Sequence, residues 1–384
     1  MNEQHDDHIA IARHLLDDFL KRTGIKDPAA DSSRRYLWTD AFAVQGCFAL
    51  SHLLKDAEYH QQALRLIDRV HHVLGQHRAD DQREGWISGL PDKEAEKHPT
   101  AGGLRIGKEL PERPAREPVN QRLDWERDGQ YFHYLTRWFH ALLQAYYETE
   151  DKQYAAWACE LMRASARFIR KDKGIIRMYW KMNIDLTEAV VRSMGAHDPL
   201  EGLVCVASSM EVSPECITDL GELEQDLKAL CRDQDWYSSD PLGIGALLLN
   251  TARAAELVMT GKTLPPSIRP EYLFGDSMAG LNFYATQGYD SFSSAANRLA
   301  FRECGLTLGV RVLYGLRQRY QHLDIDFGAL KPMVPLVDEI ESFWMQHMNQ
   351  RAASWTEHHD INAVTLACSL LARQYPAAFC AVSL

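Results

Sequence analysis

The chain lacks any cluster of lysine and arginine residues, and its formal net charge at pH 7 is -11. A protein with this charge balance has no general electrostatic attraction to nucleic acid or to anionic lipid. The first eight residues are polar and acidic, where a signal peptide would need a basic and then an apolar stretch. We also expect no apolar run to span a bilayer. These absences predict a cytoplasmic protein that binds neither nucleic acid nor membrane.

Cysteine patterns typical of metal sites are missing as well. The eight cysteines form no Cys-x-x-Cys pair, so the spacing of a thiolate zinc site does not occur. Five of them stand inside apolar runs with helical spacing, where a free cysteine behaves as a small hydrophobic residue: Cys47, Cys159, Cys205, Cys304 and Cys368. We therefore expect reduced thiols in the core, and we predict no metal ion or other cofactor.

Apolar residues at helical spacing are abundant, and 46% of the 384 residues are hydrophobic. That is enough for one large core or two smaller ones. Residues 6–22 and 57–75 each carry one apolar stripe and a charged back, which predicts amphipathic helices. Residues 35–54 are apolar nearly all round, which predicts a buried helix. An inner helix followed by an outer one fits this contrast.

The same alternation repeats to the end of the chain. Inner helices are predicted over residues 35–54, 128–149, 198–211, 240–258, 294–319 and 358–374, and outer helices over 57–75, 152–171, 217–232, 271–285, 334–347 and 6–22. Residues 174–180 form the one predicted strand. Helical pairs that cannot bury their faces alone imply a closed or stacked array. We predict a single domain over residues 1–384 with a long loop at 77–126, which either covers a cleft or lies on the surface.

Aspartates recur where the predicted buried helices begin: Asp40, Asp128, Asp198, Asp240 and Asp360. An aspartate at a helix N-terminus accepts backbone N–H groups and complements the helix dipole, so capping is a sufficient explanation for each. Tryptophans precede four of them: Trp38, Trp125, Trp236 and Trp355. Carboxylates and indoles at one end of several buried helices are what a carbohydrate-processing cleft needs.

The helical alternation resembles the (α/α)6 toroid of the six-hairpin glycosidase superfamily over nearly the whole chain. The segment Trp125-Glu-Arg-Asp-Gly-Gln-Tyr-Phe is similar to the Trp-x-Asp-Gly-x-Tyr segment of unsaturated uronyl and rhamnogalacturonyl hydrolases, with one more residue between Trp and Asp. The resemblance implies an all-α fold of six inner and six outer helices, with a cleft at the N-terminal ends of the inner helices. It also implies that Asp128 is the catalytic acid.

A second segment, Arg35-Tyr-Leu-Trp-Thr-Asp-Ala-Phe-Ala-Val-Gln-Gly, resembles the first inner helix of N-acylglucosamine and cellobiose epimerases. Those enzymes share the toroid and use a pair of histidines to move a proton beside a sugar carbonyl. By residue type, His197 and His359 are the candidates for such a pair. This resemblance implies a sugar epimerase or isomerase.

Glycoside hydrolysis needs two carboxyl groups that flank the bond, one protonated and one ionised. We predict Asp128 as the acid, with Asp40 or Asp198 as its partner on a neighbouring inner helix. As an acid, Asp128 requires the Arg127 guanidinium to point elsewhere. The predicted substrate-binding residues are the aromatic and charged neighbours of these aspartates: Trp38, Trp125, Arg127, Tyr131, Glu201, Trp355 and Asp360.

Two histidine-containing segments complete the candidate site. His197 lies just outside the predicted helix at 198–211, where capping does not explain it, so we expect it to face the cleft. Glu201 either closes a capping box or binds substrate. The segment Glu357-His358-His359-Asp360 contains metal-ligand types, but adjacent residues on a helix face apart, so we predict no metal here.

Three functions remain open from the sequence. The first is hydrolysis of a glycosidic bond by a carboxylic acid in the cleft, and the second is sugar epimerisation by His197 and His359. The third is a non-catalytic helical scaffold. Converging carboxylates favour the first, facing imidazoles the second and an apolar cleft the third. The expected partner is a small carbohydrate, and the sequence sets no oligomeric state.

Overall fold

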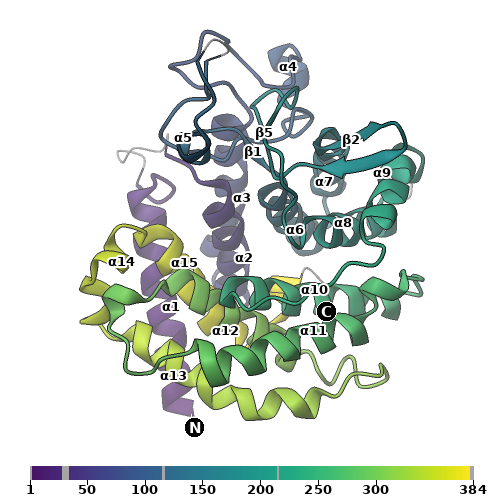
Figure 1. Cartoon of the computed structure of the whole chain (residues 1–384). Coiled ribbons are helices and arrows are strands. Elements are labelled where there is room, and N and C mark those ends of the chain that lie inside the picture. Colours follow the sequence, from purple (N-terminus) through teal and green to yellow (C-terminus); the bar gives the residue numbers. More distant parts are fainter. Residues whose placement is uncertain (1, 28–33, 115–116, 214–215, 381–384) are drawn as a thin grey trace. The chain divides into compact units, whose positions relative to one another are not determined.

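The structure is a computed structural model that describes residues 2–27, 34–114, 117–213 and 216–380 (Figure 1). The chain divides into two compact units. Unit 1 consists of residues 1–27, 42–63 and 233–384, and unit 2 consists of residues 28–41 and 64–232. Two helices, α2 (Leu37–Leu54) and α3 (Ala57–Leu74), contribute residues to both units. The single domain stays a prediction, and one cooperative unfolding transition is its test.

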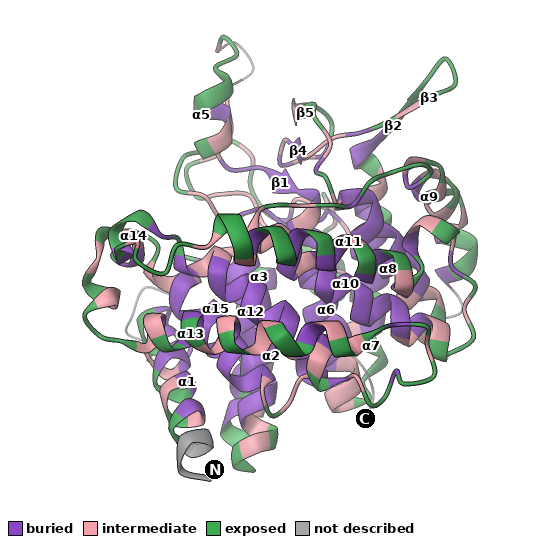
Figure 2. Cartoon of the chain, turned by 60° about the horizontal axis from the view of Figure 1, so that its bottom comes forward, coloured by how far each residue is buried: buried purple, intermediate pink, exposed green. Residues whose placement is uncertain are grey.

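In unit 1, helices that are buried on most sides alternate along the chain with helices that are exposed on one side. Its other helices are α1 (Asn2–Arg22), α10 (Pro241–Met259), α11 (Pro270–Phe283), α12 (Ala300–Gly315), α13 (Val334–Met345), α14 (Ala353–Thr356), α15 (His359–Ala372) and α16 (Ala377–Cys380). Short 3-10 or π turns lie at Pro266–Ile268, Tyr284–Gly288, Ala295–Asn297, Phe327–Met333 and Asn349–Arg351. Helix α10 packs on α11 and α12, and α12 packs on α13 and α15. Figure 2 shows buried residues along most of α10, α12 and α15, and exposed residues along one side of α11 and α13.

Unit 2 contains two pairs of long helices and two small antiparallel sheets. Its helices are α4 (Asp92–Ala95), α5 (Gln121–Glu126), α6 (Phe132–Thr149), α7 (Lys152–Ser165), α8 (Asp198–Val212) and α9 (Ile217–Leu230), with a 3-10 turn at Ala166–Phe168. Helix α6 packs on α7 and α8, and α8 packs on α9. One sheet has the order β1 (Gln130–Tyr131), β4 (Lys181–Met182), β5 (Ala189–Val191). The other pairs β2 (Ile169–Asp172) with β3 (Ile175–Met178).

The predicted helices are present, and several of their ends differ from the prediction. Helix α6 begins at Phe132 and not at 128, because residues 130–131 pair with β4 as strand β1. Helix α7 ends at Ser165 and not at 171, because residues 169–172 pair with the predicted strand as a hairpin. Helix α12 begins at Ala300 and not at 294, after a 3-10 turn. Strand pairing and turns thus shortened the helices that periodicity had predicted.

Of the five aspartates, Asp240 is the one that the structure shows as an N-cap residue with a side-chain capping hydrogen bond. Asp240 is the N-cap of α10, and its side chain accepts a hydrogen bond from the Gly243 N–H at 3.1 Å. Asp198 is the first residue of α8, directly after the N-cap residue His197, and Asp360 is the second residue of α15, whose N-cap residue is His358. Asp128 stands before a strand, so its prediction as a helix cap is wrong.

The expectation that all core cysteines are reduced is wrong for two of them. Cys159 of α7 forms a disulfide with Cys216, the residue before α9. Their separation of 57 residues is closed by the packing of α7 on α9, which periodicity does not reveal. The described cysteines outside this disulfide are all buried: Cys47, Cys205, Cys231, Cys304, Cys368 and Cys380.

One described helix, α10, has the length and apolar composition that a membrane span requires, which corrects the expectation that no run would reach it. Within the protein, 67% of the apolar window of this helix is buried. A core helix of a folded domain meets the same criteria. Its packing against α11 and α12 accounts for its apolar character.

Candidate functional site

Asp128 is a fully enclosed carboxylate in unit 2. Its Oδ1 accepts hydrogen bonds from the backbone N–H groups of Gly107, Lys108 and Gly129 at 3.0, 3.3 and 3.0 Å. Its Oδ2 accepts from Arg105 Nη1 at 2.5 Å, and the side chain has no exposed surface. Both oxygens are therefore occupied by groups of the protein, and Asp128 anchors the 105–108 segment to the start of β1.

The position after Asp128 requires glycine, because of its backbone conformation and its close contact with a neighbouring strand. Gly129 has a φ of 150°, and a Cβ on it would lie 2.6 Å from the Met182 carbonyl oxygen of the neighbouring strand. No other residue fits this approach without moving β4. The Asp-Gly pair noted in the sequence is thus explained by the entry into β1.

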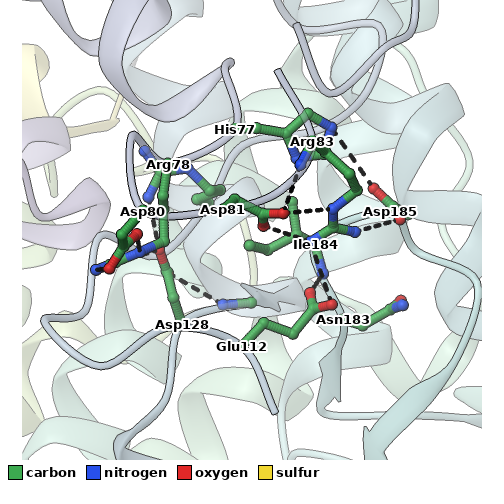
Figure 3. Close-up of polar contacts among 12 residues, drawn as sticks. His77, Arg78, Asp80, Asp81, Arg83, Glu112, Asp128, Asn183, Ile184 and Asp185 are labelled. Carbon is green, nitrogen blue, oxygen red and sulfur yellow. Dashed lines mark hydrogen bonds and ion pairs between the residues drawn. The ribbon is translucent and has the colours of Figure 1, made fainter. Parts of the chain in front are cut away.

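Arg78 ties a second part of the long loop to Asp128 (Figure 3). Its Nη1 lies 3.7 Å from Asp128 Oδ2 and donates to the Lys108 carbonyl oxygen at 2.6 Å. Its Nε and Nη2 donate to the Asp80 carboxylate at 2.7 and 2.9 Å. This hydrogen bonding lowers the pKa of Asp80. Arg78 therefore links residues 78–80, 108 and 128.

Arg83 holds three carboxylates from separate segments (Figure 3). It donates to Asp81 at 2.6 Å and to Glu112 at 3.3 Å, and it pairs with Asp185. Its hydrogen bond lowers the pKa of Asp81 to about 2, while burial raises the pKa of Glu112. His77 lies 3.9 Å from Asp185 and has its pKa lowered by burial. These contacts join residues 77–83 and 112 of the long loop to the turn after β4.

Asp40 and Trp38 are buried at the start of α2. The Asp40 carboxylate accepts from the Tyr36 N–H at 3.1 Å and lies 3.5 Å from Arg35 Nε. The Leu37 N–H donates to the Ile106 carbonyl oxygen at 3.0 Å, which joins this helix start to the segment that Asp128 anchors. Asp40 and Trp38 are 1% and 5% exposed. Both side chains are thus buried in the interior of unit 2.

Arg127 points away from Asp128, as the acid role required. Its Nη2 donates to Glu117 at 2.7 Å and its Nη1 to the Glu112 carbonyl oxygen at 3.2 Å. A different cation, Arg105, occupies the place beside Asp128. Arg105 is buried, and its remaining nitrogens donate to backbone carbonyls at 2.7 and 2.6 Å. Arg105 belongs to the loop at 77–126 that was expected to cover a cleft or lie on the surface, and the sequence does not show where such a loop folds back into the core.

Asp198 and Glu201 form a second buried pair on the first turn of α8. Asp198 is 4% exposed, and in the part of the chain that the structure describes its Oδ2 has no hydrogen-bond partner. Burial raises the pKa of Asp198 well above its ordinary value, and the charge of Glu201 raises it further. A Cβ on Gly195 would lie 2.5 Å from this carboxyl group, so the glycine makes room for it.

Glu201 has the opposite surroundings. Burial alone would raise its pKa, but Arg137 and the Thr136 hydroxyl outweigh that effect and lower it. Arg137 Nη2 donates to Oε1 at 2.6 Å, and Thr136 Oγ1 donates to Oε2 at 2.8 Å. His197, the half-buried N-cap residue of α8, adds to the lowering. Two carboxyl groups three residues apart thus differ in which protonation state the protein favours.

Aromatic rings lie beside the Asp198 carboxyl group. His133 Nδ1 is 3.8 Å from Asp198 Oδ1 and accepts a hydrogen bond from Trp180 Nε1 at 3.0 Å. The rings of Trp180 and Trp125 meet edge to face, with their centroids 5.0 Å apart, and the ring centroid of Tyr131 lies 6.2 Å from that of Trp125. The rings of His133, Trp125 and Trp180 are only half-buried. We call the following set the acid–aromatic cluster: Trp125, Tyr131, His133, Trp180, Asp198 and Glu201.

The remaining predicted site residues belong to unit 1. Asp360 Oδ1 and His359 Nδ1 contact Arg22 at 2.5 and 2.9 Å, and all three side chains are partly exposed. Burial would raise the pKa of Asp360, but His359 and Arg22 outweigh this and lower it. Trp355 is buried and stacks on Trp344 at 5.8 Å. The other predicted site residues are all in unit 2.

Four residues of the site and its supporting contacts were not predicted, although one spacing pattern covers three of them. His133, Thr136 and Arg137 are spaced i, i+3 and i+4 on α6, which puts them on one helix face. Trp180 was expected only as part of a strand. Its contact with His133 spans 47 residues and depends on the sheet that joins β1 to β4.

The described residues contain no arrangement of side chains typical of a metal centre. No group of three or more histidine, cysteine, aspartate or glutamate side chains there is arranged to hold a metal ion. A groove in unit 1 is lined by Ile9, Ala10, Arg13, His14, Asp17, Leu53 and Leu54, none of which was predicted in the site.

The sequence matches no known protein family and no curated protein. Solved structures do match. The α-1,6-mannanase GH76A from Salegentibacter sp. HEL1_6 superposes with a TM-score of 0.52 at 11% identity, over 96% of this chain and 99% of that chain. Two inactive variants of that enzyme, each with two consecutive aspartates replaced, match over 95% of this chain and 98% of theirs, at 11% identity. They were solved with α-1,6-mannotetrose (TM-score 0.52) and α-1,6-mannotriose (0.51).

These likenesses establish the fold. The chain is an all-α protein with the (α/α)6 toroid fold, as the alternation of helices predicted. They lend no support to the narrower resemblances to uronyl hydrolases or to epimerases.

Proposed function

We propose that this protein is a carbohydrate-active enzyme that hydrolyses a glycosidic bond, with Asp198 as the general acid. One observation supports the assignment above the others. Asp198 and Glu201 lie on one helical turn, and their surroundings move their pKa values in opposite directions. A glycosidase needs such a pair, one carboxyl group that keeps its proton and one that stays ionised.

The neighbours of the pair fit a sugar ligand. Trp125, Trp180 and His133 present half-buried rings beside Asp198. Indole combines a large apolar face with a polar edge, which suits the apolar face of a sugar ring and its hydroxyl groups. We assign Glu201 as the ionised partner, with Arg137 and Thr136 holding its carboxylate.

Asp128 remains a prediction as the acid, and its geometry favours anchoring. Each of its oxygens already accepts hydrogen bonds, and no part of it is exposed. The consecutive aspartates Asp80 and Asp81 are each paired with an arginine of the long loop. We therefore assign the acid and its ionised partner to Asp198 and Glu201, which lie three residues apart on α8. The epimerase and scaffold alternatives gain no comparable observation.

The first substrates to test are α-1,6-linked mannooligosaccharides, because proteins of this fold have been solved with them. We expect the purified chain to release reducing sugar from one member of a panel of mannosides and other glycosides. Asp198→Asn should lower kcat by about 10²- to 10⁴-fold, the usual contribution of a general acid, with an unchanged circular dichroism spectrum. A matched control is Asp151→Asn, which replaces the capping aspartate of α7 outside the cluster and should leave kcat unchanged.

Two results would count against the proposal. Turnover by Asp198→Asn at the wild-type rate would remove Asp198 from the acid role. A folded wild-type protein that neither binds nor cleaves any glycan of the panel would contradict the carbohydrate activity itself.

A further inference from the structure

His133 accepts a hydrogen bond from a group that can only donate. The Trp180 indole nitrogen carries a hydrogen and has no lone pair to offer, and it lies 3.0 Å from His133 Nδ1. Nδ1 must therefore be bare. In a neutral imidazole the proton then sits on Nε2. One contact between side chains thus sets the tautomer of His133.

The backbone of Trp180 is fixed beside the backbone that carries His133. Its backbone N–H donates to the Ser193 carbonyl oxygen at 2.8 Å, and its own carbonyl oxygen accepts from the Phe132 N–H at 3.3 Å. Phe132 is the residue before His133, so both partners of the pair are fixed to the same strand junction. These hydrogen bonds keep the backbone of Trp180 next to that of His133.

The charges around His133 favour its neutral form. Burial lowers the pKa of His133 to about 4, with Glu201 opposing and Arg137 adding to the shift. The facing acid, Asp198, has a raised pKa. Tyr131 and Tyr134 flank the ring at 5.3 and 4.8 Å, and their pKa values are raised too, so both are neutral near pH 7. His133 is consequently an uncharged group at neutral pH.

The Nε2–H of His133 has no partner of its own. Among the residues that the structure describes, no hydrogen bond reaches Nε2, and the side chain is 26% exposed. The same unit contains a second indole–imidazole pair, in which Trp138 Nε1 donates to His71 Nε2 at 3.1 Å. His71 is 1% exposed and serves packing. The His133 pair differs because its remaining N–H faces solvent beside a carboxyl pair.

We propose that His133 is a substrate-binding donor, whose Nε2–H is offered to a hydroxyl oxygen of the bound sugar, and that Trp180 is the residue that positions it. This rests on the proposed glycoside function. The ligand class is a neutral sugar ring with a hydroxyl group beside the scissile bond. His133 does not transfer a proton in this arrangement, and acid chemistry is left to Asp198.

The tautomer is tested without substrate, by 15N–1H NMR of the full chain with 15N-labelled histidine. His133 should show a bare Nδ1 and a protonated Nε2 from pH 8 to pH 5. Trp180→Phe, which keeps a ring but removes the donor, should add the other tautomer and move the titration of His133 upward. Trp157→Phe is the matched control, because this half-buried indole donates to the Lys97 carbonyl oxygen away from the cluster. A protonated Nδ1 in the wild type, or an unchanged spectrum in Trp180→Phe, would overturn the inference.

The donor role is tested by calorimetric binding of α-1,6-mannotriose. His133→Phe and Trp180→Phe should each weaken binding about 3- to 10-fold, the loss of one neutral hydrogen bond. His133→Gln, which keeps an N–H donor, should recover part of the loss. Equal binding by the wild type and His133→Phe would overturn the donor role and leave the proposed function standing. If the wild type does not bind α-1,6-mannotriose, both the proposed activity on this sugar and the donor role of His133 are overturned. The NMR experiment needs no sugar, so it still decides whether Trp180 sets the tautomer of His133.

Discussion

Asp128 and Asp198 are two buried aspartates of the same unit with contrasting surroundings. Asp128 receives three backbone N–H groups and the Arg105 guanidinium. Asp198 lies against Gly195, and its Oδ2 has no hydrogen-bond partner in the described part of the chain. Burial is thus common to both, and the supply of donors is what separates them.

The contrast separates an anchoring role from a chemical one. A carboxylate whose lone pairs are all occupied holds backbone in place, and removing it leaves its donors unsatisfied. A buried carboxyl group with few donors favours its neutral form, which is the form that a general acid needs. The sequence motif drew attention to Asp128, but the donor supply points to Asp198. Four variants break or sharpen this comparison.

Asp128→Asn should produce the largest loss of stability. It leaves Arg105, which is 7% exposed, without its counter-ion, and breaking a buried ion pair costs about 3 to 5 kcal/mol. Urea unfolding followed by circular dichroism measures the change. Asp81→Asn is a suitable control, since Asp81 pairs with Arg83 in a more exposed place and should cost less. A loss below about 1 kcal/mol in Asp128→Asn would contradict the anchoring role.

Gly195→Ala should destabilise the protein by about 1 to 3 kcal/mol, the usual cost of overpacking. The added Cβ would lie 2.5 Å from the Asp198 carboxyl group, which has to move. The same displacement should reduce turnover if Asp198 is the acid. Gly221→Ala is the control, because nothing lies within 4 Å of a Cβ at that position. Equal stability and equal turnover in the two variants would show that the Asp198 position is not constrained.

Asp240→Ala should cost about 1 kcal/mol through the loss of one helix cap. Asp240 caps α10 with a hydrogen bond to the Gly243 N–H. Asp240→Asn should retain most of the stability, because asparagine also caps well. Thermal unfolding of the two variants measures the difference, and an equal loss in both would assign the effect to the ion pair between Asp240 and Arg302.

Asp198→Asn should have the smallest effect on stability, and in the opposite direction. A carboxyl group whose folded-state pKa is raised contributes stability that is present below its unfolded pKa and is lost as pH rises through the folded pKa. Asparagine does not suffer this loss. The melting temperature of the variant relative to wild type should therefore increase from pH 4 to pH 8. A gain that shrinks over this range would contradict the assignment of Asp198 as a neutral acid.

Local patterns predicted the elements well where a single helix decided the outcome. Apolar residues at helical spacing located α10 and α15, and Asp240 was placed correctly as a cap. The same patterns misplaced the start of α6, because Gln130 and Tyr131 pair with β4, about 50 residues away. The disulfide between Cys159 and Cys216 was missed for the same reason, since it joins two helices through their packing.

The candidate site was predicted in part. Asp198, Glu201, Trp125 and Tyr131 were named from the sequence, and the structure brings them close to His133 and Trp180. Residue types and spacing could suggest Asp198 and Glu201 because both stand in the first turn of α8. Arg105 lies in the loop that was expected to cover a cleft or lie on the surface, but it reaches Asp128 across 23 positions.

The alternation of all-round apolar and one-sided apolar helices, and with it the all-α class, follows from residue order alone, because helical periodicity and capping involve residues within one or two turns. The roles of the two aspartates do not follow from it. Arg105 and Gly107 reach Asp128 from more than 20 positions away, and His133 and Arg137 reach the α8 carboxyl pair from more than 60. Only the folded chain decides which carboxyl group is surrounded by donors, because protonation depends on burial and on neighbouring charges in space.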